Sequence, residues 1–220
     1  MCEIFLKILA AYLLGNLMGG QLVGRLRGVD LRAQGSGNIG ATNALRTQGK
    51  KFALVVLAID AGKGVLAATL LPALHWPWSG ATALDRETVA CLCGGAAVFG
   101  HCYPVFHKFR GGKGVATLAG VYGALMTATV PWILLGFIVV VILTGYVSLA
   151  TLMAAMLALL HVTCFDPRGL FSALGAFALT MTLLVLWKHR ENWSRLLRGN
   201  ENRFERARLL HRWLGRWLQR

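Results

Sequence analysis

Residues 100–116 read GHCYPVFHKFRGGKGVA and separate two long apolar runs of the chain. The side chains in this stretch that carry or can carry a positive charge are His107, Lys108, Arg110 and Lys113. Glycines let backbone N–H groups approach a ligand, and a helix that begins near Lys113 would add the positive end of its dipole. The pattern indicates a phosphate site at a membrane surface. The alternative is a cytoplasmic loop whose cations only determine topology.

The composition indicates a polytopic membrane protein. Of 220 residues, 56% are hydrophobic and 15% are charged, and the apolar residues form long runs. The net charge of +14 lies between and after these runs. We therefore expect the basic residues to meet lipid headgroups or a small phosphate substrate, and not nucleic acid. The five cysteines show no CxxC pair and no metal-like His/Cys spacing, so we predict no disulfide, metal or cofactor.

The apolar runs predict an all-α integral membrane protein with seven transmembrane helices. The first run, residues 4–23, would be about 30 Å long as a helix, which matches one hydrocarbon thickness. The run 115–163 is too long for one or two helices, so we divide it into three at Pro131-Trp132 and at residues 144–148. The remaining predicted spans are residues 52–74, 88–106 and 170–187.

The charges between the runs predict the orientation of the chain. Residues 24–51 hold six cations and one acid, whereas residues 75–87 hold one cation, two acids and two tryptophans. Cytoplasmic loops are rich in Lys and Arg, so the N-terminus is expected outside and the C-terminus in the cytoplasm. We expect one polytopic domain over residues 1–202, followed by a basic amphipathic tail over residues 203–220 that lies on an anionic leaflet.

Two opposite charges lie inside the second predicted span. Asp60 and Lys63 are three residues apart, so a helix would place them on one face, where they can pair. A charge near the bilayer centre costs about 2.5 to 3.5 kcal/mol on insertion scales, so such residues usually face a polar interior. The pair is therefore either part of a site or an internal ion pair that only fixes helix packing.

Three polar strings emerge on the predicted cytoplasmic face. Residues 34–43 read QGSGNIGATN, residues 100–116 form the second string, and residues 189–202 read HRENWSRLLRGNEN. Their donors include glycine N–H groups, the Ser36 hydroxyl, the Asn38 and Asn43 amides, and the side chains of Arg46, His101, Lys108, Lys113, His189 and Asn192. Many donors and few acids favour an anionic ligand, most simply phosphate.

These strings, in this order and spacing, closely resemble the three motifs of the bacterial acyl-phosphate:glycerol-3-phosphate acyltransferase family, PlsY. The resemblance covers residues from about 3 to 202 and includes the Asp60/Lys63 pair. It departs from the family pattern at Ile39, where proline is usual, and at His107, where an aliphatic residue is common. Neither departure removes a charged or nucleophilic group.

The resemblance implies a reaction and a location. The family transfers a fatty acyl group from acyl phosphate to the 1-hydroxyl of sn-glycerol 3-phosphate, which gives lysophosphatidic acid and phosphate. Its members are multi-pass proteins of the bacterial cytoplasmic (inner) membrane with an active site that faces the cytoplasm. The expected partners are therefore acyl phosphate, glycerol 3-phosphate, the lipid bilayer and the soluble enzyme that forms acyl phosphate.

The resemblance and the donor chemistry together suggest roles for single residues. We expect Arg46, Lys113 and the backbone of residues 36–38 to hold phosphates, and Lys108 with the His189/Asn192 pair to orient glycerol 3-phosphate. The expected substrate-binding residues are Gly35, Gly37, Asn38, Gly40, Thr42, Asn43, Arg46, Lys63, Lys108, Gly111, Gly112, Asn192 and Glu201. The expected catalytic residues are Ser36, Lys113, His189 and His101.

Three alternatives remain open at this point. Ser36 is either a hydrogen-bonding ligand or a covalent nucleophile, and acyl phosphate, a mixed anhydride with a good leaving group, has little need of the latter. The general base is His101, His189 or a substrate phosphate, and His101 can instead only bond to backbone at a helix end. A transporter of an organic phosphate, with Asp60 and Lys63 along its pathway, is the competing class of protein, although no repeat of the first spans is evident.

Overall fold

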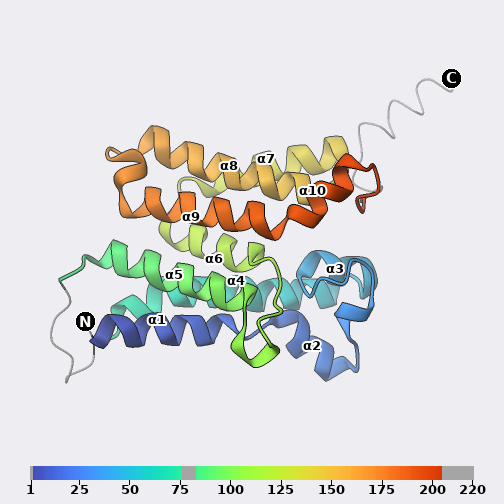
Figure 1. Ribbon diagram of the computed structural model, residues 1–220, viewed down its shortest axis with the longest axis horizontal. Helices are drawn as coiled ribbons and strands as arrows, with labels where there is room; N and C mark the ends of the chain where they lie inside the picture. The colour runs from blue at the N-terminus through green and yellow to red at the C-terminus, as the bar shows by residue number, and fades with distance from the viewer. Residues whose placement is uncertain (1, 76–82, 205–220) are drawn as a thin grey trace. The chain divides into compact units, whose positions relative to one another are not determined.

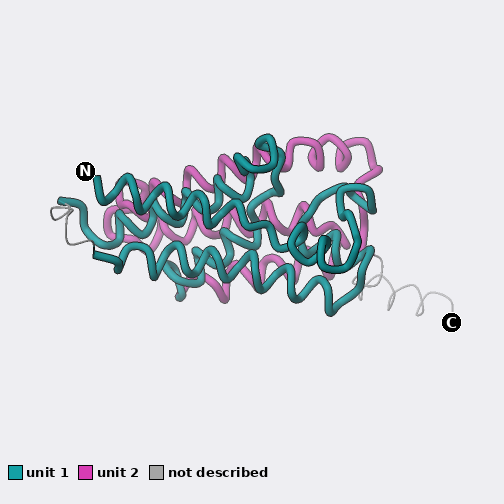
Figure 2. Tube along the Cα trace, turned by 90° about the horizontal axis from the view of Figure 1, so that it is seen from below, with its two compact units in different colours: residues 1–127 teal, residues 128–220 magenta. Residues whose placement is uncertain are grey.

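The computed structural model describes residues 2–75 and 83–204. All regular structure in these residues is helical, as predicted, and the chain divides into two compact units, residues 1–127 and 128–220 (Figure 2). The predicted outer tryptophans at 76 and 78 and most of the predicted amphipathic tail at 203–220 lie outside the described residues.

The described residues of unit 1 form six α-helices and two short 3-10 turns (Figure 1). They are α1 (Cys2–Gly15), α2 (Gly19–Arg27), η1 (Leu31–Ala33), α3 (Ala41–Thr47), α4 (Lys50–Ala73), α5 (Arg86–Cys102), η2 (Val105–His107) and α6 (Val115–Leu125). Helix α4 packs against α6 and α5, and α1 packs against α5. Helices α2 and α3 also pack on α4. The long helix α4 therefore contains the Asp60/Lys63 pair and supports α3, in which the first polar string ends.

Glycines allow the main helix pairs of unit 1 to approach closely. A Cβ at Gly64 of α4 would overlap the carbonyl oxygen of Thr117, and a Cβ at Gly120 of α6 would overlap that of Ala61. Gly100 of α5 lies in the same way against the backbone of α1. Because lipid gives helices no hydrophobic reason to associate, small residues that permit close van der Waals packing are a usual basis of such interfaces.

Unit 2 contains α7 (Val130–Thr144), α8 (Val147–Phe165), η3 (Gly169–Phe171), α9 (Ala173–Lys188) and α10 (Arg190–Leu197). Helix α8 packs against both α7 and α9. Helix α7 has Pro131 in its first turn, and it ends at Gly145, whose φ of 76° suits glycine. The predicted division of residues 115–163 into three helices and the second break, at residues 145–146, are confirmed. The first break lies at residues 126–129 and not at Pro131-Trp132, which belong to the first turn of α7.

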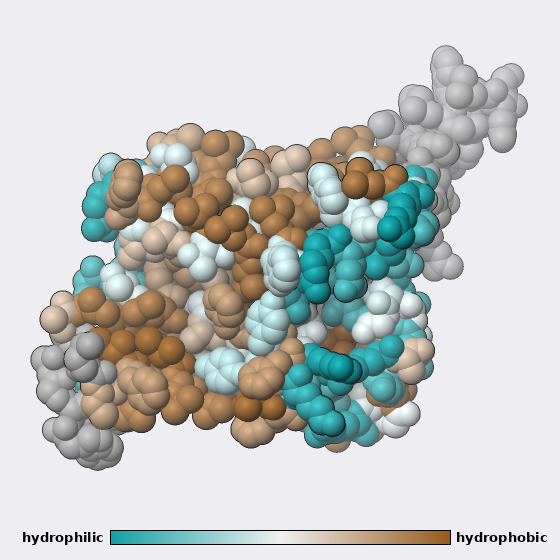
Figure 3. Space-filling model, viewed as in Figure 1, coloured by the Kyte–Doolittle hydropathy of each residue, from teal (hydrophilic) through white to brown (hydrophobic). Residues whose placement is uncertain are grey.

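The spans are confirmed only in part. Among the described residues, Lys50–Ala73, Arg86–His107 and Val147–Phe165 are long and apolar enough to cross a membrane, and α1 with α2, bent by 40°, would add a fourth span. Three shorter helices, α6, α7 and α9, are also apolar. Large apolar side chains cover much of the surface of the long helices (Figure 3). The count of seven spans and the orientation stay predictions.

Candidate active site

The first polar string is folded around the side chain of Asn43. Its Oδ1 accepts a hydrogen bond from the Ser36 N–H at 2.9 Å. Its Nδ2 donates toward three backbone carbonyls, those of Leu31, Gln34 and Asn38, at 3.0, 2.9 and 2.8 Å. Asn43 is 1% exposed, so this amide belongs to the interior of the loop. We had expected Asn43 to bind substrate, but its visible role is to shape the loop that would do so.

Most other residues of this string are at least partly accessible, whereas Ile39 is buried. Gly35 and Gly37 have φ values of 57° and 70°, and together with Ser36 they are exposed. A Cβ at Gly35 would overlap Oδ1 of Asn43, so glycine is required there by space as well as by conformation. Asn38, Gly40, Thr42 and Arg46 are half-buried, with Gly40 directly before α3 and the last two within it.

The second string turns back on the end of α5. The N–H groups of Gly111 and Gly112 donate to the carbonyl oxygens of Cys102 and His101 at 3.2 and 3.1 Å. A Cβ at Gly112 would overlap Nε2 of His101, so the imidazole lies directly against this glycine. Helix α6 begins two residues after Lys113, at Val115, which confirms the helix start expected there. Lys113 is half-buried, whereas Lys108 is exposed with a φ of 53°.

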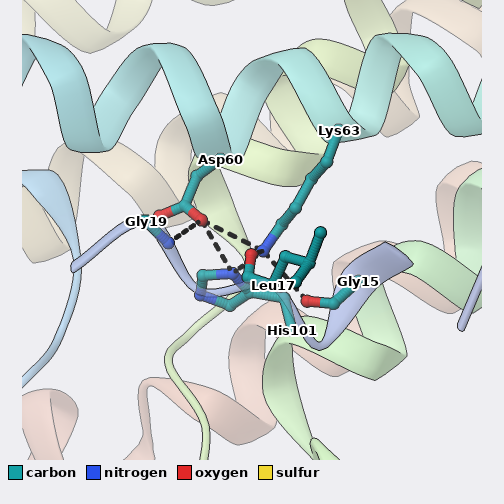
Figure 4. Close-up of polar contacts among 6 residues, drawn as sticks. All are labelled: Gly15, Leu17, Gly19, Asp60, Lys63 and His101. Atoms are coloured by element: carbon teal, nitrogen blue, oxygen red, sulfur yellow. Dashed lines mark hydrogen bonds and ion pairs between the residues drawn. The ribbon is translucent and has the colours of Figure 1, made fainter. Parts of the chain in front are cut away.

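Asp60 and Lys63 form the predicted ion pair, with 3.0 Å between Nζ and Oδ1, and they brace the break between α1 and α2 (Figure 4). Lys63 Nζ donates to the carbonyl oxygens of Gly15 and Leu17 at 2.9 and 2.6 Å, and Asp60 Oδ1 accepts from the Gly19 N–H at 3.0 Å. The cation therefore lies at the C-terminal end of α1 and the carboxylate at the N-terminus of α2, where each satisfies backbone groups and each opposes a helix dipole.

His101 joins this cluster from α5. Its Nδ1 lies 2.8 Å from Lys63 Nζ and 3.4 Å from Asp60 Oδ1, and the residue is 3% exposed. Lys63 has only donors, so we assign Nδ1 as the acceptor and place the ring hydrogen on Nε2. His101 and Lys63, both expected to act on substrate, thus engage the protein interior. Asp60 uses only Oδ1 in this cluster, and its Oδ2 is buried without a hydrogen bond from any described residue.

The third string lies in unit 2 and is organised around Glu201. Oε1 of Glu201 accepts from Asn192 Nδ2 at 2.7 Å and from Ser148 Oγ at 3.1 Å, and Oε2 pairs with Arg195 Nε at 2.7 Å. Glu201 and Asn192 are both buried. The chain after α10 is thereby held against α8. Ser148 and Arg195 were not among the predicted site residues, since the sequence shows no pattern that pairs them with Glu201.

His189 lies at the junction of α9 and α10. Its ring Nδ1 is 2.9 Å from the carbonyl oxygen of Val185, and since a carbonyl only accepts, Nδ1 carries the hydrogen. Nε2 of the neutral ring therefore holds the lone pair, the reverse of the arrangement in His101. Asn192, three residues later, follows in the same helix, as expected. The convergence of this string with the two strings of unit 1 stays a prediction.

Comparison with known proteins identifies the family. The sequence model of the family described as glycerol-3-phosphate acyltransferase matches residues 5–199. The chain is 39% identical to the glycerol-3-phosphate acyltransferase of Geotalea daltonii over 201 residues, which are 90% of this chain and 96% of the relative. It is 38% identical to that of Aquifex aeolicus over 199 residues, 90% of this chain and 97% of the relative.

Two solved structures agree with this result. Both are crystal structures of PlsY, described as an integral membrane glycerol 3-phosphate acyltransferase, one in a glycerol 3-phosphate form and one in a lysophosphatidic acid form. The TM-scores are 0.79 and 0.78 at 34% and 33% identity, and each match covers 94% of this chain and 98% of the solved one. The chain is therefore a membrane-bound acyltransferase that belongs to the glycerol-3-phosphate acyltransferase family.

Proposed function

We propose that this enzyme transfers a fatty acyl group from acyl phosphate to the 1-hydroxyl of sn-glycerol 3-phosphate and releases lysophosphatidic acid and phosphate. The observation that carries the proposal is the match along nearly the whole chain to PlsY in glycerol 3-phosphate and lysophosphatidic acid forms, which are the acceptor and the product of this reaction. The exposed glycine-rich loop at residues 35–37 and the nearby cations supply the donors that two phosphate-bearing molecules require.

The transfer is direct. The 1-hydroxyl oxygen attacks the carbonyl carbon of acyl phosphate, a new C–O ester bond forms, and the bond from that carbon to the phosphate oxygen breaks. The leaving phosphate takes the electron pair, and the hydroxyl proton passes to a base. The protein then has two tasks: to hold two phosphates that repel each other, and to stabilise the developing oxyanion.

Within unit 1, we assign the phosphate contacts to the accessible groups. Ser36 offers a hydroxyl and, with Gly35 and Gly37, an exposed backbone, while Arg46 and Lys113 offer charge at half-buried positions. Ser36 hydrogen bonds to a ligand in this scheme and forms no acyl-enzyme. Asn38, Gly40, Thr42, Lys108 and Gly111 complete the expected surface of the two strings, whereas Gly112 is buried and its N–H donates to the His101 carbonyl.

Lys63, His101 and Asn192 are buried, and in this proposal they act by positioning. Lys63 holds the break between α1 and α2, and the His101 ring lies against Gly112, beside Lys113. In unit 2, Glu201 fixes Asn192. A polar group that is already satisfied in the interior gains little from a ligand, and its removal costs the packing of the loop that it supports.

The base is His189 in this proposal. Its Nδ1 donates to the Val185 carbonyl, so Nε2 is the nitrogen that can take a proton, whereas His101 Nδ1 accepts from Lys63 and its Nε2 carries hydrogen. We expect His189→Gln to lower kcat by about 10²-fold or more, the usual contribution of general base catalysis. A kcat within fivefold of wild type would leave the leaving phosphate as the base.

The charge of the first loop suggests where the enzyme acts. We place the enzyme in the bacterial inner membrane with its site toward the cytoplasm, because residues 24–51 carry six cations against one acid. On that side the soluble enzyme that forms acyl phosphate can deliver the donor directly to the membrane.

The decisive experiment measures product formation by purified protein in detergent from labelled glycerol 3-phosphate, with palmitoyl phosphate or palmitoyl coenzyme A as the donor. Lysophosphatidic acid from palmitoyl phosphate alone supports the proposed donor, and product from the coenzyme A ester alone overturns it. Arg46→Ala and Lys113→Ala should each reduce turnover by orders of magnitude while the protein still inserts; near-normal turnover would remove these residues from the site.

A further inference from the structure

A separate cavity lies in unit 1 between α2 and the segment that follows it. Its volume is about 190 Å³, far above the roughly 10–15 Å³ that one water needs. The lining residues are Gly20, Gln21, Arg25, Val29, Asp30, Leu31, Arg32 and Ile39. None of them is among the residues assigned above to substrate or catalysis, so the cavity has no role in the proposed reaction.

The cavity has a positive electrostatic character. Arg25 and Arg32 line it, and the only carboxylate among the lining residues, Asp30, accepts a hydrogen bond from the Arg32 N–H at 2.9 Å. Arginine presents a planar set of donors that suits phosphate oxygens, so an anion is the expected occupant.

The adjacent surface of α2 is apolar. Leu22 and Leu26, also four residues apart, are 49% and 78% exposed. A short helix that presents leucines on one side and arginines on another is typical of the boundary between acyl chains and headgroups. The hydrophilic side chains of unit 1 gather at the end that carries α2 and α3 (Figure 3), which is where headgroup phosphates or soluble phosphates can reach the cavity.

We propose that this cavity is a second anion site, which binds a phosphate group. Arg25 and Arg32 hold the phosphate oxygens. The phosphate belongs either to the headgroup of an anionic lipid such as phosphatidylglycerol or to a free phosphate in the cytoplasm. Ile39 forms part of the wall and its carbonyl lies against Gly20, so the occupant also contacts the first polar string.

The test compares two variants of one helix. Arg25→Gln removes a cavity charge, whereas Arg27→Gln removes an equal charge two residues away, on an exposed position that does not line the cavity. Full-length protein in detergent is titrated with phosphatidylglycerol, with phosphatidylcholine as the neutral lipid, and binding is counted by native mass spectrometry. A parallel calorimetric titration uses inorganic phosphate.

We expect Arg25→Gln to weaken the binding of one probe at least tenfold, with Arg27→Gln within twofold of wild type. Loss of phosphatidylglycerol alone identifies a headgroup site, and loss of inorganic phosphate alone identifies a site for free phosphate. Arg32→Gln removes the other cationic side chain that lines the cavity, and it should weaken the same probe at least threefold.

Wild-type affinity of Arg25→Gln and Arg32→Gln for both probes would overturn the proposal, and so would an equal loss in Arg27→Gln. Product formation is measured in the same wild-type sample. If wild-type protein makes no lysophosphatidic acid from either donor, the proposed reaction fails, while the binding comparison still decides the second site. If product forms and the binding of Arg25→Gln and Arg32→Gln is unchanged, only the second site fails.

Discussion

Replacing Asn43 with alanine tests whether one buried amide shapes the first polar string. The change removes the acceptor of the Ser36 N–H and both hydrogens that Nδ2 shares among three carbonyls, with partner distances between 2.8 and 3.0 Å. Each hydrogen bond contributes about 1 kcal/mol net, so three hydrogens correspond to about 3 kcal/mol. Because 1.4 kcal/mol is a tenfold change, a loop that must be reordered by substrate would lose about 100-fold in kcat/KM.

The assay is steady-state turnover in detergent, together with thermal unfolding of the same samples. Thr47→Val is the matched control, since Thr47 lies one turn later in α3 and its hydroxyl only donates to the Asn43 carbonyl at 3.0 Å. We expect the control to remain within about 0.5 kcal/mol of wild type in stability and near wild type in turnover. A kcat/KM for Asn43→Ala within fivefold of wild type, in a folded sample, would refute the organising role of this amide.

Three further changes probe the other buried contacts. Lys63→Met leaves the Asp60 carboxylate buried without its cation, so we expect the free energy of unfolding, measured by thermal unfolding, to fall by about 3 to 5 kcal/mol. Adding Asp60→Asn should recover part of this loss. Equal stability of the single and double variants would contradict the pairing. Gly112→Ala places a methyl group against the His101 ring and should reduce turnover at least tenfold, whereas Gly123→Ala, where a Cβ meets nothing within 4 Å, should be neutral. Glu201→Gln removes the charge that pairs with an arginine, and we expect the KM for glycerol 3-phosphate to rise about tenfold with kcat less affected; an unchanged KM would argue against the positioning role.

The sequence predicted local features well. Pro131 and Gly145 mark helix boundaries through their backbone chemistry, which acts within one or two residues, and the structure has its breaks beside both. The pairing of Asp60 with Lys63 was equally predictable, because a spacing of three positions on a helix determines which side chains meet. Helix length and hydropathy were less decisive, since α6 has only 11 residues and rises about 16 Å, well short of the hydrocarbon thickness of about 30 Å.

Long-range partners were not predictable in the same way. Lys63 contacts carbonyls 46 and 48 positions away, and Glu201 accepts from Ser148, 53 positions away. No periodicity links residues so far apart in the chain. The orientation of the Asn43 side chain was also not predictable. An amide in a glycine-rich string has the same chemistry whether it faces a ligand or the carbonyls of its own loop.

Burial separates these two possibilities on physical grounds. In the low-dielectric interior a polar side chain must be satisfied before any ligand arrives, and once satisfied it can serve a ligand only if it gives up a bond of similar strength. Asn43 and Glu201 meet this condition through internal partners. The contacts that gain most from a phosphate are then the exposed Ser36 hydroxyl and the cations that are only half-buried, because the N–H groups of Ser36 and Gly37 already donate within the loop. Substrate affinity should accordingly depend on the charges of Arg46 and Lys113, and on the loop geometry that the buried Asn43 amide maintains.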